Sequence, residues 1–488
     1  MFKNPKVAIV TVNWNKRDYV LNLLNSLKHI NYDNYNIIVV DNASTDDSVT
    51  AIKEHFPNVN LIVNSENLGG TGGFNTGIKY VLEATDKYKY IWLLDNDAVV
   101  EKDTLIELVN VAEKDEAVGI VGSMIMESDK NFIVELGGFV NWSNGTWKPN
   151  LRNHRADYLN LEDAVEVDYV AACSALIRVK VLREIGVMDE RYFLHWDDID
   201  LSLRVRKSGF KVKAVPKSRV CHGVENKPFN ILFVYYDTRN ALLTISKHRN
   251  GLDRFINIFN VLRIATKGMI YSLLTDSSSI TKCIFHAIWD FVNNKFYRAD
   301  IPLGMDLSIS YKTRYLPKDL NISSSSKILI LPNGTHSEIK KLVELIRSQS
   351  TNCHISLLVQ ADRAELFRKL PIDVLIIFDS LKQTTLRLIS LFGKLLLHRY
   401  DICISPTLYP LPFSYAVNKY FLYDKNSDLF FESKENLSSS WKLILAFLGG
   451  EILALFLMPI VYCASFKYRS IDNPNLEKPF NTAKYNEH

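Results

Sequence analysis

The chain has 488 residues, more than one ordinary domain holds, so we expect two or three folded units. Hydrophobic residues make up 47% of the chain and charged residues 23%, which excludes a disordered or fibrous protein. The formal net charge of +4 is too small to indicate a nucleic-acid binder, although it is compatible with weak attraction to an anionic membrane surface.

The first 228 residues alternate strand-like apolar runs with amphipathic helical patterns. The strands are expected at 6–11, 37–40, 61–63 and 90–94, with helices between them at 19–29, 48–55 and 74–84. This order predicts an α/β domain with a mainly parallel sheet covered by helices on both faces. Ligands of such sheets bind beyond the carboxyl ends of the strands, so residues that follow these strands are candidates for the site.

The rest of the chain has a different pattern. Residues 229–300 are expected to form an apolar helical extension, and the serine-rich stretch within 301–326 a linker. Residues 327–435 return to a strand–helix alternation and predict a second, small Rossmann-like α/β domain. That domain carries neither the dinucleotide fingerprint nor the P-loop motif, so its role stays open.

Residues 441–466 form an apolar segment long enough to associate with a membrane, followed by a polar tail at 467–488. Glu451 and Pro459 argue against a simple span, since a charge at mid-membrane is costly and proline bends a helix. The basic residues after the segment conflict with a single crossing from a cytosolic enzyme. A hairpin that turns at Gly449 and Gly450 would remove this conflict, and the topology is left open.

The start of the chain resembles no signal peptide, and its six cysteines include no CxxC pair. We therefore expect reduced, buried cysteines and a catalytic part on the cytoplasmic side of the membrane.

Asp95-Asn96-Asp97 directly follows the fourth predicted strand. Two carboxylates at this spacing suit one divalent cation, Mg²⁺ or Mn²⁺, whose coordination shell is completed by substrate phosphate oxygens. The alternative is an ordinary strand-ending turn, since Asp and Asn are common turn residues. The position after a buried strand favours the metal site.

Two further clusters follow earlier strands. Asp41 ends the second strand and is suited to accept hydrogen bonds from a base or ribose, while Ser44–Asp46 are expected to cap the next helix. A glycine-rich segment at 66–74 precedes the third helix, where close backbone approach and free N–H groups favour an anion.

The segment from Phe193 to Arg204 holds a second group of acids. Trp196 is expected to be exposed and to offer an aromatic face to a sugar ring. One of the adjacent acids can act as a general base toward an acceptor hydroxyl, and its neighbour can orient that hydroxyl. A structural role at the head of a helix also explains Asp198 or Asp200. His222 follows a later strand and suits a Mn²⁺-type site.

Together these segments resemble the family 2 glycosyltransferases of GT-A fold, over roughly residues 5 to 245. The matching motifs occur in the family's order: VTVNWNKRDYVLNLLNSL, VVDNASTDDS, NLGGTGGFNTG, WLLDNDA, GVMDERYFLHWDDIDLSLRVRKSGFKV and YYDTRNALL. The glycine-rich segment and the Trp-Asp-Asp triplet are similar to those of bacterial galactofuranosyltransferases and rhamnosyltransferases of cell-surface glycans.

The resemblance implies an inverting transfer of galactofuranose or rhamnose from a UDP- or dTDP-sugar to a glycan or lipid-linked acceptor at the membrane. Asp198 would be the catalytic base, and Trp196 and Asp197 would bind the acceptor. On the donor side, the residues implied are Asn13, Asp41, Asn67, Thr71, Asp95 and Asp97. Asp97 and His222 would be the metal ligands.

Two other functions are weighed against this one. A sugar-phosphate nucleotidyltransferase shares the open α/β architecture but usually has a glycine- and arginine-rich loop after the first strand, where this chain reads TVNWNKRDY. A non-catalytic scaffold for membrane assembly is disfavoured by the retained acids, the glycine-rich segment and His222. The choice between the two donor sugars stays open.

Overall fold

The structure is a computed structural model of the chain. It describes residues 4–84, 87–127, 132–142, 145–152, 154–156, 161–222, 231–274, 278–299, 315–317, 320, 322–331, 336–360, 364–378, 400–405, 419–424, 429–433 and 440–468. Most of the expected linker at 301–326 and nearly all of the polar tail lie outside these residues.

The chain divides into two compact units. The first comprises Met1–Met269, Ser278–Leu307 and Gly450–His488, and the second comprises Ile270–Ser277 and Ser308–Gly449. Each unit has its own sheet and its own hydrophobic core.

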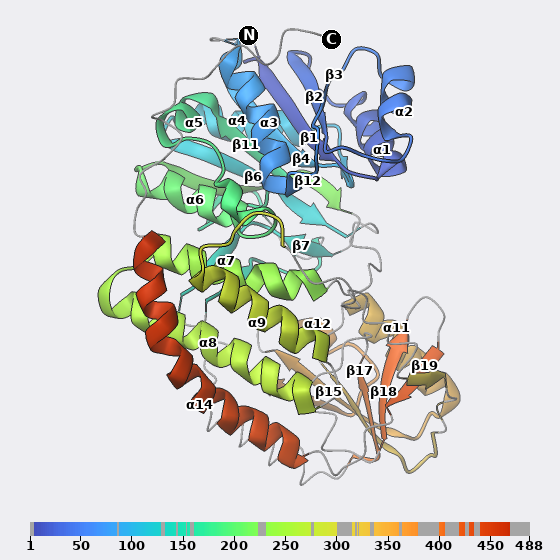
Figure 1. The fold of residues 1–488 in the computed structure, drawn as a ribbon. Helices are drawn as coiled ribbons and strands as arrows, with labels where there is room; N and C mark the ends of the chain where they lie inside the picture. Colours follow the sequence, from blue (N-terminus) through green and yellow to red (C-terminus); the bar gives the residue numbers. More distant parts are fainter. Residues whose placement is uncertain are drawn as a thin grey trace. The chain divides into compact units, whose positions relative to one another are not determined.

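The first unit contains a ten-stranded sheet with the order β10-β12-β6-β11-β4-β1-β2-β3, to which β5 and β7 add at β12 and β6 (Figure 1). The strands are β1 (Val7–Asn13), β2 (Tyr35–Asp41), β3 (Asn60–Val63), β4 (Tyr90–Asp95), β5 (Ala98–Val100), β6 (Val118–Met126), β7 (Ile133–Glu135), β10 (Val165–Glu166), β11 (Ser174–Arg178) and β12 (Lys211–His222). Strands β3, β2, β1 and β4 are mutually parallel, and β11 runs antiparallel between β4 and β6. The predicted mainly parallel sheet is confirmed.

Helices cover both faces of this sheet because side chains alternate along each strand. On β1, Ala8 and Val10 join the core beneath α3, whereas Val7 and Ile9 join the core beneath α1, α2 and α4. The helices of this unit up to residue 222 are α1 (Arg17–Leu27), α2 (Ser48–His55), α3 (Gly69–Glu83), α4 (Thr104–Lys114), α5 (Val179–Ile185) and α6 (Asp197–Lys207). A short hairpin, β8 (Gly138–Asn141) with β9 (Thr146–Pro149), lies outside the main sheet.

The register of the parallel strands brings three predicted site residues to one edge. Asn13 pairs with Asp41 across β1 and β2, and Val12 pairs with Asp95 across β1 and β4. The carboxyl ends of parallel strands therefore meet where the sequence predicted a site.

Helix α3 begins at Gly69, not at Phe74 as predicted. Its glycines allow close packing: a Cβ on Gly73 would lie 2.4 Å from Val12 Cγ1, and one on Gly77 would lie 2.3 Å from Val10 Cγ1. The glycine-rich segment is therefore largely the first turns of a helix pressed onto the sheet, which is why a helix propensity scale misses them.

The helical extension is formed by α7 (Ile231–His248), α8 (Gly251–Leu274) and α9 (Ser278–Val292). Part of the C-terminal helix α14 (Ser440–Ser465) packs against these helices through a shared apolar core, and a short 3-10 turn, η6 (Phe466–Tyr468), follows it (Figure 1). The segment Leu448–Tyr468 is long and apolar enough to cross a membrane, with a mean hydropathy of 1.7, and one third of it is buried against the protein.

A hairpin at Gly449 and Gly450 is wrong, since α14 is continuous through both glycines and through Pro459. The backbone carbonyl of Gly450 accepts a hydrogen bond of 2.7 Å from Thr266 Oγ1. A Cβ on Gly450 would lie 2.5 Å from Lys267 Cγ. This glycine permits close contact with α8 instead of a turn.

The second unit is the α/β domain expected after residue 327. Its seven-stranded sheet has the order β13-β19-β18-β17-β14-β15-β16, parallel from β16 to β18 and antiparallel at β19 and β13. The elements are β13 (Tyr315–Pro317), β14 (Lys327–Ile330), α11 (His336–Gln349), β15 (His354–Gln360), α12 (Ala364–Phe367), β16 (Val374–Phe378), β17 (Ile402–Ser405), β18 (Lys419–Asp424) and β19 (Leu429–Ser433).

Replacing Gly77 by alanine tests the close packing of α3 on the sheet. Alanine favours a helix interior by about 1 kcal/mol, but overpacking costs about 1–3 kcal/mol, so we expect Gly77→Ala to lower the stability. Gly268→Ala is the matched control, because a Cβ there would meet only Ile284 Cδ1, at 3.4 Å. Thermal unfolding should show a lower Tm for Gly77→Ala and no loss for Gly268→Ala. An equal or higher Tm for Gly77→Ala would contradict this packing.

Candidate active site

Asn13 and Asp41 fix one another at the ends of β1 and β2. Asn13 Nδ2 donates to Asp41 Oδ2 at 3.2 Å, and Asn13 Oδ1 accepts from Asn96 Nδ2 at 3.0 Å. The backbone N–H and hydroxyl of Ser44 also donate to Asp41, at 2.8 and 2.7 Å. Asn13 and Asp41 are fully buried, so the structure places them as supports of the strand ends. Their contact with a nucleoside stays a prediction.

Asp46, not Ser44, reaches the start of α2. Asp46 Oδ1 accepts from the backbone N–H of Ser48 at 3.1 Å, whereas Ser44 Oγ bonds Asp41 and accepts from the N–H of Asn15. The N-cap residue of α2 is Asp47, which forms no side-chain cap, so Asp46 satisfies the first N–H from one residue earlier and Ser44 belongs to the strand-end network.

Asp95, Asp97 and His222 form the predicted acid–imidazole cluster. His222 Nε2 lies 3.0 Å from Asp97 Oδ1 and 3.5 Å from Asp95 Oδ2. The cause is local: β5 turns back after Asp97 and pairs antiparallel with the end of β12, opposing Ala98 to His222. The structure thus brings together side chains that lie up to 127 residues apart in the sequence.

The charge of this cluster is unbalanced without a cation. Burial alone lowers the pKa of His222, but the hydrogen bonds and negative charges of Asp95 and Asp97 outweigh it and raise the pKa to about 10. A divalent ion bound by His222 would have to displace this proton, because a metal-bound histidine is neutral.

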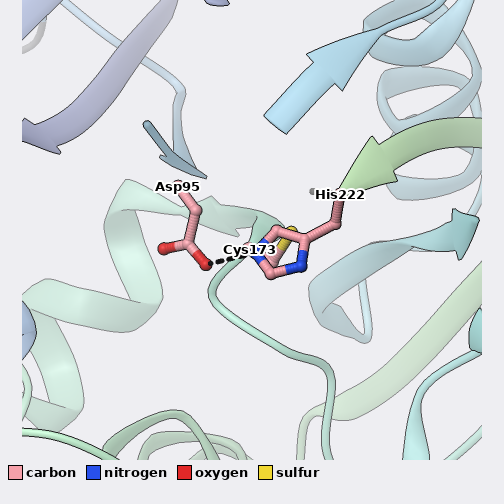
Figure 2. Close-up of side chains that lie close together, drawn as sticks. All are labelled: Asp95, Cys173 and His222. Carbon is pink, nitrogen blue, oxygen red and sulfur yellow. Dashed lines mark ion pairs between the residues drawn. The ribbon is translucent and has the colours of Figure 1, made fainter. Parts of the chain in front are cut away.

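Cys173 lies beside this cluster and was not predicted as part of the site. Its Sγ and single ligand atoms of Asp95 and His222 lie within 4.8 Å of one another (Figure 2). Burial and the surrounding carboxylates raise the pKa of the Cys173 thiol well above its ordinary value, which opposes a thiolate. Two carboxylates and an imidazole therefore fit Mn²⁺ or Mg²⁺ chemistry, and the thiol does not. An isolated cysteine in an apolar run gives no sequence signal for this position.

The acids after Trp196 are presented by an unusual turn. Phe193, His195 and Trp196 have φ values of 63°, 65° and 69°, a left-handed conformation that costs each non-glycine residue about 1–3 kcal/mol. The turn follows the short helix η2 (Glu190–Tyr192) and ends at the first residue of α6. It places Asp197 and Asp198 at a helix N-terminus, where a carboxylate is stabilised.

Asp198 retains partial solvent access and is held by the backbone. Its Oδ1 accepts from the N–H of Ile199 at 2.7 Å, and its Oδ2 accepts from the N–H of Ala172 at 3.2 Å. Desolvation and the negative charge of Asp197 raise the pKa of Asp198 to about 7. A carboxyl group with this pKa is suited to proton transfer near neutral pH.

Asp197 and the start of α3 are joined directly. Thr71 Oγ1 donates to Asp197 Oδ2 at 2.7 Å, and both side chains are buried. Burial raises the pKa of Asp197. The anion expected at the start of this helix is thus in part a carboxylate of the protein. Asn67 Oδ1 accepts from the N–H of Gly69 at 2.8 Å. The donor-binding roles of Thr71 and Asn67, and the acceptor-binding role of Asp197, stay predictions.

The expectation that Trp196 is exposed is wrong, because its side chain is only 3% exposed. It packs in the apolar core shared with Tyr169, Tyr192 and the helices that follow. Its indole Nε1 has no hydrogen-bond partner among the described residues. A role of Trp196 in acceptor binding stays a prediction.

Glu135 is an acid that the sequence analysis missed. It lies at the end of β7, and Tyr169 Oη donates to its Oε2 at 3.3 Å. Burial, followed by the negative charge of Asp198, raises the pKa of Glu135 to about 8. Its position next to Asp198 comes from the pairing of β7 with β6, which no local motif reveals.

Asp200 has a structural role, one of the two possibilities left open for it. Its side chain is fully buried, and it forms ion pairs with Arg204 at 3.0 Å and Lys247 at 2.7 Å. It thereby ties α6 to α7 and leaves Asp198 as the more accessible acid of the segment.

Comparison with known proteins shows what the first part of the chain is similar to. Residues 8–186 match the family model described as Glycosyl transferase family 2. The N-acetylglucosaminyl-diphospho-decaprenol L-rhamnosyltransferase of Mycobacterium tuberculosis is 24% identical over 237 residues, which are 44% of this chain and 75% of that protein. Rhamnosyltransferase WbbL of Escherichia coli is 27% identical over 283 residues, 52% of this chain and 99% of WbbL.

A third relative is a larger protein. Galactofuranosyltransferase GlfT2 of Mycobacterium tuberculosis is 24% identical over 203 residues, 38% of this chain and 31% of GlfT2. The family model ends before Trp196, so the roles of the acids of α6 stay predictions. The family model over residues 8–186 and these relatives together support a family 2 glycosyltransferase.

Proposed function

We propose that this enzyme is a metal-assisted, inverting transferase that moves galactofuranose or rhamnose from a UDP- or dTDP-sugar to a hydroxyl group. The acceptor is proposed to be a cell-surface glycan or a lipid-linked precursor. The relatives named above are two rhamnosyltransferases and a galactofuranosyltransferase. The name of one rhamnosyltransferase gives a diphospho-decaprenol acceptor. These names support both sugars and do not separate them.

One observation carries the proposal: the acid–imidazole cluster and Asp198 are supported by neighbouring residues of one segment. The N–H of Ala172 donates to Asp198, and the carbonyl of Cys173 accepts from the N–H of Asp95 at 3.3 Å. A cation site for a diphosphate and a base for a hydroxyl group therefore lie close together, as a displacement at the anomeric carbon requires.

Asp95, Asp97 and His222 would hold the divalent ion, which neutralises the charge that builds on the departing nucleoside diphosphate. Asp198 takes the proton from the acceptor hydroxyl while the hydroxyl oxygen forms a bond to the anomeric carbon. The bond from that carbon to the diphosphate oxygen breaks on the opposite side, so the configuration inverts. The diphosphate leaves with the electron pair of the broken bond.

The membrane is the proposed location of the acceptor. In the first unit, large apolar side chains are exposed on α8, α9 and α14: Leu252, Phe255, Ile256, Ile264, Phe285, Trp289, Ile452, Leu455, Phe456 and Ile460. An exposed apolar surface of this extent is typical of a membrane or protein interaction site. Lys282, Lys295, Arg298 and Lys467 are exposed on the same helices or just beyond their ends, which favours an anionic lipid surface.

The contacts of α14 favour a helix that lies along the membrane over one that crosses it alone. Glu451 accepts from Arg263 Nε and Nη2 at 2.5 and 2.6 Å and pairs with Lys267 at 2.7 Å. A lone span would place this carboxylate in hydrocarbon without its partners, at a large cost. We therefore propose an interfacial attachment on the cytoplasmic side.

The pH dependence of transfer tests the role of Asp198. Because its raised pKa of about 7 leaves it protonated at lower pH, kcat/KM for the acceptor should fall about tenfold per unit below that value. Asp198→Asn should reduce kcat by about 10²–10⁴-fold and abolish this dependence, with donor binding largely retained. Initial rates measured from pH 5 to 9 with nucleotide-sugar donor and calorimetry of donor binding check both expectations. Unchanged transfer by Asp198→Asn would refute the assignment.

The metal site is tested by removing its imidazole ligand. His222→Ala should raise the Mn²⁺ concentration needed for half-maximal transfer by about 10–100-fold, since a lost ligand or its support weakens metal sites by this order. His154→Ala is a suitable control, because His154 is outside the cluster and partly exposed. Titration of Mn²⁺ into the metal-stripped enzyme measures both variants. Full activity of the wild type in excess chelator would contradict a metal-assisted reaction.

Membrane attachment is tested by charging the apolar face of α14. The double variant Phe456→Asp and Ile460→Asp should lose most of its co-sedimentation with vesicles of mixed zwitterionic and anionic phospholipid. Val63→Asp carries the same change at a 52% exposed apolar residue of β3 and should bind as the wild type does. Equal binding of all three proteins would contradict this surface.

A further inference from the structure

The motif YYDTRNALL, residues 235–243, belongs to the family resemblance but has no role in the chemistry above. It lies in α7, and three of its side chains, those of Asp237, Arg239 and Asn240, contact the strained turn that precedes α6 or the residues that lead into it. Asp237 Oδ1 lies 3.1 Å from His195 Nδ1. Arg239 and Asn240, which follow, form several hydrogen bonds with the backbone of the same turn and of the residues that lead into it.

Asn240 spans the backbone of the turn. Its side chain is fully buried, and Nδ2 donates to the carbonyls of Tyr192, Leu194 and His195 at 3.1, 2.8 and 2.9 Å. Its Oδ1 accepts from Arg239 Nε at 3.0 Å, which fixes the orientation of the amide. One side chain thus satisfies carbonyls on both sides of the left-handed residue Phe193.

Arg239 holds the entrance of the same turn. Its guanidinium is fully buried and donates from Nη2 to the carbonyls of Arg191 and Tyr192, both at 3.0 Å. Nη1 donates to the carbonyl of Tyr297 at 3.0 Å, and the group lies over the rings of Tyr235 and Tyr236. A buried charge needs such complete hydrogen bonding, so the turn and Arg239 depend on each other.

The opposite side of the turn packs on α3. The carbonyl of Phe193 accepts from the N–H of Thr71 at 3.2 Å, and a Cβ on Gly69 would lie 2.3 Å from that carbonyl oxygen. The turn is therefore held between the helix that carries the proposed donor residues and α7. Non-glycine residues keep a left-handed conformation only when their surroundings determine it in this way.

We propose that Arg239 and Asn240 are positioning residues that hold the turn of Phe193–Trp196 in its left-handed conformation and thereby set Asp198 toward the acceptor hydroxyl. This inference rests on the proposed role of Asp198 as the base. Both side chains contact the backbone carbonyls of the turn and not the carboxylates, so they act through geometry alone. Displacing a base by about 1 Å is enough to slow a reaction by about 10²-fold.

Asn240→Asp is the sharpest test, because it keeps the shape of the side chain and removes both N–H donors. We expect kcat for transfer to fall about 10–100-fold, by the cost of a misplaced group, with the KM for donor unchanged. The acidic limb of the pH profile should move from its wild-type position, since a loosened turn changes the burial of Asp198. Arg239→Lys keeps the charge but loses the planar fork of donors. It should also lower kcat with the KM for donor unchanged, to a smaller degree, and it serves as the test if Asn240→Asp fails to fold.

Ser246→Ala is the control, because Ser246 is equally buried on α7 and its Oγ donates to Leu242 within the same helix. It should retain the kcat and pH profile of the wild type. Folded Asn240→Asp and Arg239→Lys with wild-type kcat and pH profile would overturn the inference, as would an equal loss of donor binding and transfer. A fully active Asp198→Asn enzyme would instead show that the proposed base is wrong, whatever the result at Asn240.

Discussion

Crowding of carboxylates at the carboxyl end of the main sheet is the constraint on which the site depends. The pKa of the Cys173 thiol shows this crowding. Burial raises that pKa most, and the negative charges of Asp95, Asp97, Glu135 and Asp198 raise it further. Asp95 ends β4 and Asp97 follows it, Glu135 ends β7 and Asp198 lies in α6, so the fold brings together acids from three parts of the chain. Repulsion between them makes every charge in the site depend on its neighbours.

Two kinds of acid result from this crowding. Asp95 and Asp97 share the positive charge of His222, which keeps them suited to a cation and, through it, to a diphosphate. For Asp198 and Glu135, burial and the neighbouring carboxylates outweigh the attraction of His195, Arg152 and His222, and their pKa values rise to about 7 and about 8. A proton can therefore be exchanged near neutral pH on the side of the site that holds Asp198 and Glu135.

Much of the scaffold could be predicted from the sequence, because strands and helices with strong periodicity follow one another in order. The positions of Asp41, Asp95 and His222 at strand ends followed from that order and from the parallel sheet. Glu135 and Cys173 could not be predicted, because they reach the site through β7 and β11, which pair antiparallel with β6 and β4 far from any motif.

Packing explains the other differences. The sequence predicted an exposed Trp196, but apolar residues of α7 and neighbouring helices bury its side chain. Gly73 and Gly450 looked like loop or turn residues, yet both lie in helices pressed against a neighbour. In each case a long-range contact overrides the local preference, and α7 in particular joins the chain's helical extension to the turn that presents Asp198.

The stereochemistry of transfer tests the central claim most directly, because Asp198 acting as a base, and not as a nucleophile, predicts one displacement. Proton and carbon NMR of the product, compared with the donor, reports the anomeric configuration of the transferred sugar. Inversion at the anomeric carbon is the predicted result. Retention of the donor configuration would require two displacements and would contradict the account of Asp198 as a base.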